Sequence, residues 1–215
     1  MLISHQNKFV FIAINKTATT SIHDALGCVS EIKSVGDSQS PFYFHATAKK
    51  IKSKFKENNW DWNSYFKFSF VRNPWDRMVS AYFYRLKMMK KWNITKPNDK
   101  HTQDVYESFK VQLHSTNNFN EWLKKYIEHK SVAFHQHKFL YENDEKLVDF
   151  VGKFENLNND FNHVMNKIKC RHIKLPFLNK SSRKSYKEYY TEETRNMIKN
   201  YYMKDLKLFN YNYDN

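Results

Sequence analysis

The chain has 215 residues, of which 40% are hydrophobic and 17% aromatic, and this composition supports a sizeable core and excludes disorder for most of the chain. Its formal net charge of +14 favours an anionic partner, such as a nucleic acid, an acidic membrane surface or a small molecule that carries phosphate or sulfate. Two cysteines cannot form a disulfide framework, and no apolar run approaches the ~20 residues that span a bilayer, so the sequence predicts a cytoplasmic protein without stable membrane insertion.

The stretch from Lys8 to Gly27 predicts a strand, a short polar loop and a helix. Residues 8–14 are apolar and rich in β-branched and aromatic side chains, which is typical of a strand buried on both faces in a parallel sheet. Residues 15–21 hold Lys16 among small hydroxyl side chains, and the helix that follows ends at Gly27, a good C′ residue. Backbone N–H groups at such a helix start attract an anion. A plain turn capped by Ser and Thr is the alternative interpretation.

A second strand, turn and helix follow further along the chain. Residues 65–71 predict a strand, which ends at Arg72. Asn73 is a plausible N-cap, Pro74 stands at the first helical position, and Ser80 lies outside the apolar stripe of the helix. In open α/β sheets, ligands bind at the carboxyl ends of strands. Two such units therefore suggest a ligand with anionic groups at two ends.

His45 precedes a predicted lysine-rich helix over residues 46–55. A histidine at a helix start lies near the positive end of the dipole, which disfavours the imidazolium. A neutral imidazole near pH 7 can accept a proton, so His45 is a candidate base. A capping or core histidine is the alternative.

The rest of the chain adds helices, one strand and a basic loop. Residues 88–117 are basic and polar with weak periodicity, and they predict an excursion from the sheet. His135 and His137 are too few ligands for a zinc site, so we predict no metal. The remaining predicted elements are a helix over 118–129, a strand over 147–154, a helix over 160–169, a basic loop over 179–184 and a helix over 191–203 that is N-capped by Thr191.

These segments together resemble the sulfotransferases that use 3′-phosphoadenosine 5′-phosphosulfate (PAPS), in particular their carbohydrate-type branch. Residues 14–21 (Ile-Asn-Lys-Thr-Ala-Thr-Thr-Ser) are similar to the 5′-phosphosulfate loop of that family. Residues 70–82 (Phe-Val-Arg-Asn-Pro-Trp-Asp-Arg-Met-Val-Ser-Ala-Tyr) are similar to its 3′-phosphate motif, which is long and specific. Residues 152–157 and 175–190 are similar to later landmarks. The resemblance implies an α/β, P-loop-like three-layer fold with a central, mostly parallel sheet flanked by helices.

The resemblance also implies a role for each matching residue. Lys16 would contact the oxygen that bridges phosphate and sulfate, and His45 would be the catalytic base. Arg72 and Ser80 would bind the 3′-phosphate. The other cofactor-binding residues that it implies are Thr17, Ala18, Thr19, Thr20 and Ser21 around the 5′ end, with Lys180 and Arg183 from the carboxyl-terminal loop.

Two positions depart from the family pattern, and both lie in the first loop. Asn15 replaces a proline that is common before the lysine, and Ala18 stands where many relatives have glycine. Neither change removes the anion-binding chemistry, but both alter the residues that shape the loop.

We therefore expect a single domain over residues 1–215, with residues 88–137 as a helical excursion on the acceptor side. The expected reaction moves a sulfuryl group from PAPS to a hydroxyl, on a carbohydrate, by in-line displacement with a histidine base and without a metal. One alternative is a P-loop kinase or nucleotide triphosphatase, which the missing Gly-x-x-x-x-Gly-Lys pattern disfavours. Another is a basic nucleic-acid-binding module, for which the sequence offers no recognised motif. A third is a sulfotransferase that binds its ligands without reacting.

Overall fold

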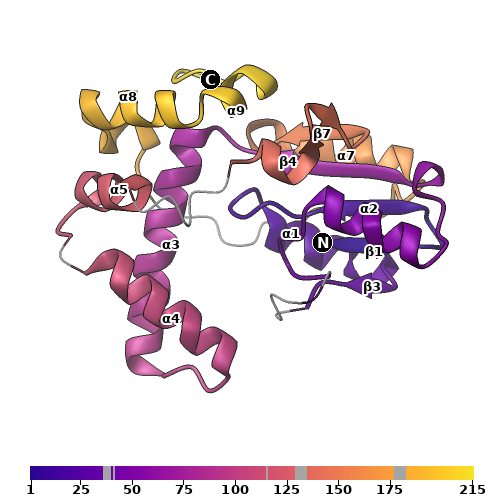
Figure 1. The fold of residues 1–215 in the computed structure, drawn as a ribbon, viewed down its shortest axis with the longest axis horizontal. Helices are drawn as coiled ribbons and strands as arrows, with labels where there is room; N and C mark the ends of the chain where they lie inside the picture. Colours follow the sequence, from indigo (N-terminus) through magenta and orange to yellow (C-terminus); the bar gives the residue numbers. More distant parts are fainter. Residues whose placement is uncertain (36–39, 41, 115, 129–134, 177–182) are drawn as a thin grey trace. The chain divides into compact units, whose positions relative to one another are not determined.

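A computed structural model of the chain describes residues 1–35, 40, 42–114, 116–128, 135–176 and 183–215. The chain divides into two compact units (Figure 1): the first unit is Met1–Arg72 with Gln136–Ser182, and the second unit is Asn73–His135 with Arg183–Asn215. The chain therefore leaves the first unit directly after Arg72 and returns to it at Gln136.

The first unit is built on a sheet whose strands run mostly in one direction. The strands are β1 (Leu2–Ser4), β2 (Phe9–Ile12), β3 (Ile32–Lys33), β4 (Phe66–Val71) and β7 (Phe150–Lys153), in the spatial order β3-β1-β2-β4-β7. β2, β4 and β7 are parallel neighbours, and β1 is antiparallel to both β2 and β3. Of the five strands in the described part of this sheet, only β1 runs against the others. The predicted α/β fold with a mostly parallel sheet is confirmed.

Helices cover both faces of this sheet, which makes three layers. On one face, Phe11, Phe68 and Phe70 pack in a common core with α1 (Thr19–Leu26) and α7 (Leu157–Lys167). On the other face, Lys67 lies over the Trp62 ring at 5.6 Å, and that ring packs 5.0 Å from Phe55 of α2 (Ala48–Glu57). Side chains alternate between faces along a strand, which is why Lys67 and its neighbours in β4 meet different helices. The unit also contains the short helix α6 (His137–Leu140) and a hairpin of β5 (Tyr141–Glu142) and β6 (Glu145–Lys146).

The second unit is helical in its described part and is centred on one long helix, α3 (Pro74–Ile94), beside which α4 and α5 lie (Figure 1). Its other helices are α4 (Lys100–Leu113), α5 (Phe119–Glu128), α8 (Glu192–Tyr201) and α9 (Met203–Phe209). The buried guanidinium of Arg85 on α3 lies 4.9 Å from the ring centre of Phe109, 5.3 Å from that of Trp122 and 5.0 Å from that of Tyr126. These cation–π contacts and a 2.7 Å hydrogen bond from Arg85 Nε to the Gln112 side chain join α3 to α4 and α5.

The structure changes several element boundaries. The helix expected over 46–55 is α2, which starts at Ala48 because Thr47 accepts a hydrogen bond from the Lys50 N–H and caps it. Gly27 has the right-handed φ of −61° and continues into a 3₁₀ turn, so it is not a left-handed C′ residue. The weakly periodic stretch over 88–117 contains the end of α3 and all of α4. The strand expected over 147–154 is confined to β7.

Of the helices in the described residues, none combines the length and the apolar character that a bilayer crossing requires. The longest, α3, carries charged side chains in its first turn and throughout its second half.

The contact between Gly152 of β7 and Phe70 of β4 gives a test of the sheet. A Cβ atom added at Gly152 would lie 2.5 Å from Phe70 Cε1 and 3.1 Å from the Asp160 Cβ of α7. We expect Gly152→Ala to lower the free energy of unfolding by about 1–3 kcal/mol, because this buried site cannot accommodate the methyl group without moving its neighbours. Urea denaturation of both proteins measures the difference.

Gly27→Ala is the matched control for this prediction. A Cβ atom there meets nothing within 4 Å, and the backbone is helical. We expect this variant to be as stable as the parent or about 0.5 kcal/mol more stable, because alanine loses less backbone freedom on folding. Equal stability of the two variants would contradict the packing of β7 against β4.

Candidate functional site

The loop between β2 and α1 has a backbone shape that suits an anion. Lys16 and Ala18 both adopt the left-handed region, with φ of 67° and 63°. The hydroxyls of Thr17 and Thr19 both donate to the carbonyl of Ile14, at 2.8 and 2.6 Å. These two bonds connect the loop to the end of β2. Both threonine hydroxyls therefore donate their protons within the protein and not to a ligand. Turns with left-handed residues direct successive backbone N–H groups into a concavity that binds anions.

The backbone N–H groups in the first turn of α1 lack a side-chain acceptor from the N-cap residue. Ala18 is the N-cap, and its methyl side chain cannot accept a hydrogen bond from the first turn. Alanine at this position typically costs about 0.5–2 kcal/mol relative to a capping residue. An anion at the helix start would supply the missing acceptor and would also interact favourably with the dipole. In the same turn, Thr20 is exposed and Ser21 is buried.

Arg72 brings a second cation to this loop. It follows β4 directly, and its Nη1 donates to the Lys16 carbonyl at 3.2 Å. Its guanidinium carbon lies 3.8 Å from the ring centre of Phe154, which follows β7. The ends of β2, β4 and β7 therefore meet around Arg72, at the carboxyl edge of the sheet where the sequence predicts a ligand.

Gln136 holds the backbone of Arg72 from both sides. The Arg72 N–H donates to Gln136 Oε1 at 2.9 Å, and Gln136 Nε2 donates to the Arg72 carbonyl at 2.8 Å. The Gln136 side chain is fully buried, so these bonds replace water at both backbone groups. The amide thus fixes the position from which the arginine side chain reaches the loop.

His45 is tied to the same sheet edge. Its Nδ1 lies 2.9 Å from the carbonyl oxygen of Ala13, the residue that follows β2. A carbonyl can only accept, so Nδ1 carries a proton and the neutral ring keeps its lone pair on Nε2. His45 lies two residues before the N-cap of α2, so this hydrogen bond, and not the helix start that the sequence suggests, orients the ring.

His23 on α1 is a second imidazole near this edge. The pKa of His23 is lowered to about 4, mainly by burial and to a smaller extent by electrostatic interaction with the amino terminus and with His45. A base with so low a pKa accepts a proton poorly at neutral pH. Of the two histidines, His45 is therefore the better candidate base.

The remaining predicted residues lie in the second unit or outside the described residues. Ser80 is half-buried on α3, one turn after Asp76. Arg183 forms a hydrogen-bonded ion pair with Asp76, which places its guanidinium beside the face of α3 that carries Ser80. Lys180 lies outside the described residues.

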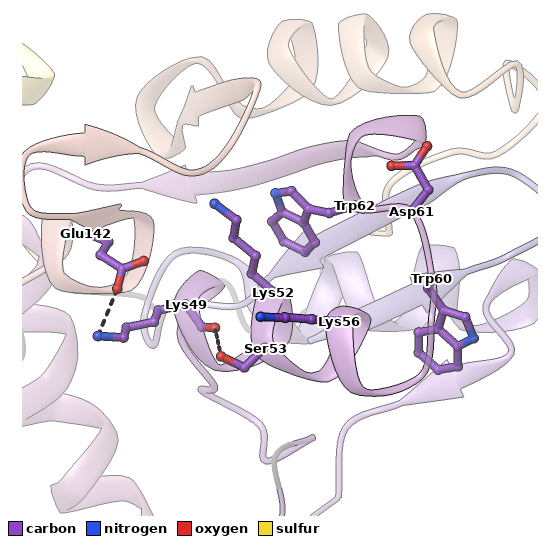
Figure 2. A pocket seen from close by; sticks show the side chains of 8 residues that line it. All are labelled: Lys49, Lys52, Ser53, Lys56, Trp60, Asp61, Trp62 and Glu142. Atoms are coloured by element: carbon purple, nitrogen blue, oxygen red, sulfur yellow. Dashed lines mark hydrogen bonds and ion pairs between the residues drawn. The ribbon is translucent and has the colours of Figure 1, made fainter.

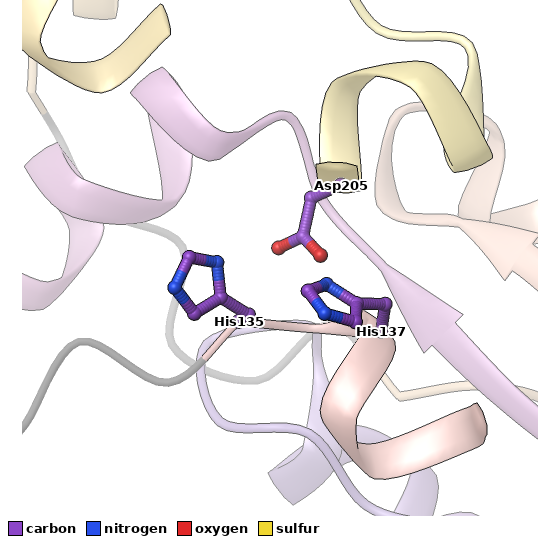
Figure 3. Close-up of side chains that lie close together, drawn as sticks. All are labelled: His135, His137 and Asp205. Atoms are coloured by element: carbon purple, nitrogen blue, oxygen red, sulfur yellow. The ribbon is translucent and has the colours of Figure 1, made fainter. Parts of the chain in front are cut away.

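Figure 3 draws the side chains of His135, His137 and Asp205, which belong to different units of the chain. Within the second unit, His135 stacks on Tyr201 with ring centres 4.8 Å apart, and Asp205 of α9 is fully buried. His137 belongs to the first unit, where it begins α6.

Within the first unit, the structure brings together Lys16, Arg72 and His45 on the segments that follow β2 and β4 or are bonded to them. Two cationic side chains, a helix start and one oriented imidazole can hold a phosphate-like group and accept a proton beside it. Sequence reasoning missed Gln136 and Phe154. Gln136 lies between His135 and His137, which the sequence analysis considered only as metal ligands. Its hydrogen-bond partner, Arg72, is 64 residues away in the sequence.

Two comparisons with known proteins give matches. The model of a family described as the sulfotransferase family matches residues 1–212. An uncharacterized protein of Archaeoglobus fulgidus is 29% identical over 106 residues, which is 49% of this chain and 69% of that protein.

The amide of Gln136 provides a test of how the site is held. Gln136→Leu keeps the volume but leaves the buried N–H and carbonyl of Arg72 without their partners. We expect the free energy of unfolding to fall by about 2–4 kcal/mol, since each unsatisfied buried group costs about 1–3 kcal/mol. Chemical denaturation measures the loss.

The exposed Gln6 of the same unit offers the control, because Gln6→Leu should change stability by less than about 0.5 kcal/mol. If Gln136→Leu were as stable as Gln6→Leu, the amide would not hold Arg72 as described.

Proposed function

The chain belongs to the sulfotransferase family, and on this premise we propose that it transfers a sulfuryl group from PAPS to an acceptor hydroxyl, on a carbohydrate. The observation that carries the proposal is the bond from the Arg72 guanidinium to the Lys16 carbonyl. It joins the loop suited to a 5′-phosphosulfate with the arginine suited to a 3′-phosphate. A single adenosine compound with anionic groups at both ends would satisfy both.

In the proposed reaction, the acceptor oxygen attacks sulfur while the bond from sulfur to the bridging phosphate oxygen breaks. Adenosine 3′,5′-bisphosphate leaves, and negative charge grows on the oxygen that departs. The Lys16 ammonium near that oxygen would interact more strongly with the transition state than with the bound donor. The backbone of residues 17–21 would hold the 5′ end, because the hydroxyls of Thr17 and Thr19 already donate to Ile14.

His45 would remove the proton of the acceptor hydroxyl. Its Nδ1 proton is engaged by the Ala13 carbonyl, so Nε2 is the atom that accepts. General base catalysis of this kind contributes about 10²–10⁴-fold to a rate. The imidazole would then carry a positive charge, which the Ala13 carbonyl dipole stabilises through the same hydrogen bond.

Arg72 and Ser80 would bind the 3′-phosphate, and Arg183 with Lys180 would complete the donor site. Arg183 is paired with Asp76, so a phosphate near it would share or replace that partner. The carbohydrate acceptor, the cytoplasmic location and the lack of a metal requirement remain predictions.

Lys16→Ala and Arg72→Ala test the donor site. We expect each to lower kcat/KM for PAPS-dependent transfer by at least about 100-fold, the usual cost of removing one group that stabilises developing charge. Transfer of radiolabelled sulfate across a panel of hydroxyl acceptors measures the activity, and a thermal shift with adenosine 3′,5′-bisphosphate measures donor-site binding.

Lys33→Ala is the matched control, since it removes one exposed positive charge from β3 of the same unit. It should keep the parent activity. A larger thermal shift with ATP than with adenosine 3′,5′-bisphosphate would favour a kinase or nucleotide triphosphatase instead. Parent-like turnover of both site variants would refute the proposal.

His45→Asn separates chemistry from binding. The asparagine amide can still donate to the Ala13 carbonyl but offers no basic nitrogen. We expect kcat to fall by about 10²-fold or more while the affinity for adenosine 3′,5′-bisphosphate stays within about twofold. Steady-state kinetics and calorimetric titration measure the two quantities. An unchanged kcat would assign His45 a structural role.

A further inference from the structure

The outer face of α2 and the loop that follows it form a pocket of about 430 Å³ in the first unit (Figure 2). Lys49, Lys52 and Lys56 line it from successive turns of α2. Residues three and four apart lie on the same face of a helix, so the three ammonium groups serve one surface. Trp60 and Trp62 line the pocket from the loop between α2 and β4.

Two of the three lysines are available for a ligand. Lys49 is paired with Glu142 at 2.8 Å. The side-chain ammonium groups of Lys52 and Lys56 make no hydrogen bond or ion pair with any residue in the described ranges. The pocket therefore presents a positive charge that its own acidic residues do not neutralise, and an anionic group would complement it.

Trp60 and Trp62 are half-buried and pack against other aromatic rings. Trp60 packs edge-to-face against His5 and Phe55, with ring centres 4.4 and 5.3 Å apart, and Trp62 packs against Phe55 at 5.0 Å. Neither indole N–H has a hydrogen-bond acceptor among the residues that the structure describes. Fixed indoles with available N–H groups provide an apolar surface and a donor at a low entropic cost.

The hydrogen-bond acceptors that line the pocket indicate which class of anionic ligand it can bind. Glu142 places a carboxylate beside Lys49, and Asp61 and Ser53 add a second carboxylate and a hydroxyl to the lining of the pocket. Carboxylates repel a continuous phosphate backbone, but they accept hydrogen bonds from neutral hydroxyl groups. Indole faces pack against the C–H face of a sugar ring. Lysines, carboxylates and indoles together match a molecule that carries many hydroxyls and a few acidic groups.

We propose that this pocket binds an acidic saccharide, with Lys52 and Lys56 on its carboxylate or sulfate groups and Trp60 and Trp62 against its rings. The volume is of the size that holds a small ligand or a few sugar units of a longer chain.

The pocket is separate from the donor loop. Trp62 precedes β4 and Arg72 follows it, and a strand of this length spans about 20 Å at roughly 3.3 Å per residue. The Trp60 and Trp62 end of the pocket is therefore remote from the Lys16 loop, whereas its Lys49 end begins four residues after His45. This assignment does not depend on the transfer reaction, because binding is measured without any donor.

The test is a calorimetric titration of the full chain with a sulfated, uronic-acid-containing hexasaccharide. We expect the Lys52→Ala, Lys56→Ala double variant to bind at least about tenfold more weakly, since one lost charged hydrogen bond is worth about that factor. Tryptophan fluorescence gives a second readout. Trp60 and Trp62 are half-buried, whereas Trp75, Trp92 and Trp122 of the second unit are buried, so a change on binding reports the pocket.

The Lys50→Ala, Lys54→Ala double variant is the matched control. It removes the same charge from the same helix, at positions outside the pocket. It should bind within about threefold of the parent, because these surface charges act only through a screened field. Adenosine 3′,5′-bisphosphate should stabilise all three proteins equally, and a loss of that stabilisation alone would concern the donor site.

Three results would overturn the proposal. The control pair could weaken binding as much as Lys52→Ala, Lys56→Ala does, which would indicate a non-specific electrostatic attraction. An uncharged glucose hexasaccharide could bind as tightly as the acidic one. A single-stranded oligonucleotide of equal charge could bind more tightly through the same two lysines, which would assign the pocket to nucleic acid.

Discussion

The hydrogen bond from the Arg72 guanidinium to the Lys16 carbonyl is the interaction on which the candidate site depends. It joins the segments that follow two parallel strands, β2 and β4, and it depends in turn on the sheet that aligns their carboxyl ends. Arg72 is buried between the loop and the Phe154 ring, and a buried guanidinium persists only where its donors find acceptors. The loop carbonyl and the aromatic face meet part of that demand, and an anionic ligand would add charge complementarity.

The sequence predicts the buried strands of this sheet edge and the caps of two helices. The apolar runs before Asn15 and Arg72 predict the buried strands, because parallel strands covered on both faces lack a polar side. Asn73 caps α3 and Pro74 opens it as predicted, and Thr191 caps α8, because capping is decided by neighbouring residues.

The features that the sequence did not predict are either very short strands or contacts between residues that are far apart in the sequence. β1 and β3 have three and two residues, too few to show a period, and they become strands only through pairing with each other and with β2. The role of Gln136 depends on a partner 64 residues away. The position of His45 depends on Thr47, a better N-cap that shifts the start of α2, and on a carbonyl 32 residues upstream.

The left-handed backbone at Lys16 and Ala18 has a kinetic meaning. A glycine-rich loop samples many conformations. A ligand then binds either by selecting the competent conformation or by inducing it. Here, side chains occupy positions that glycine would otherwise fill, and the Thr17 and Thr19 hydroxyls tie the loop to β2. Such a loop has few conformations available. We therefore expect the association rate of the donor to be limited by diffusional encounter, without a slow rearrangement of the loop afterwards.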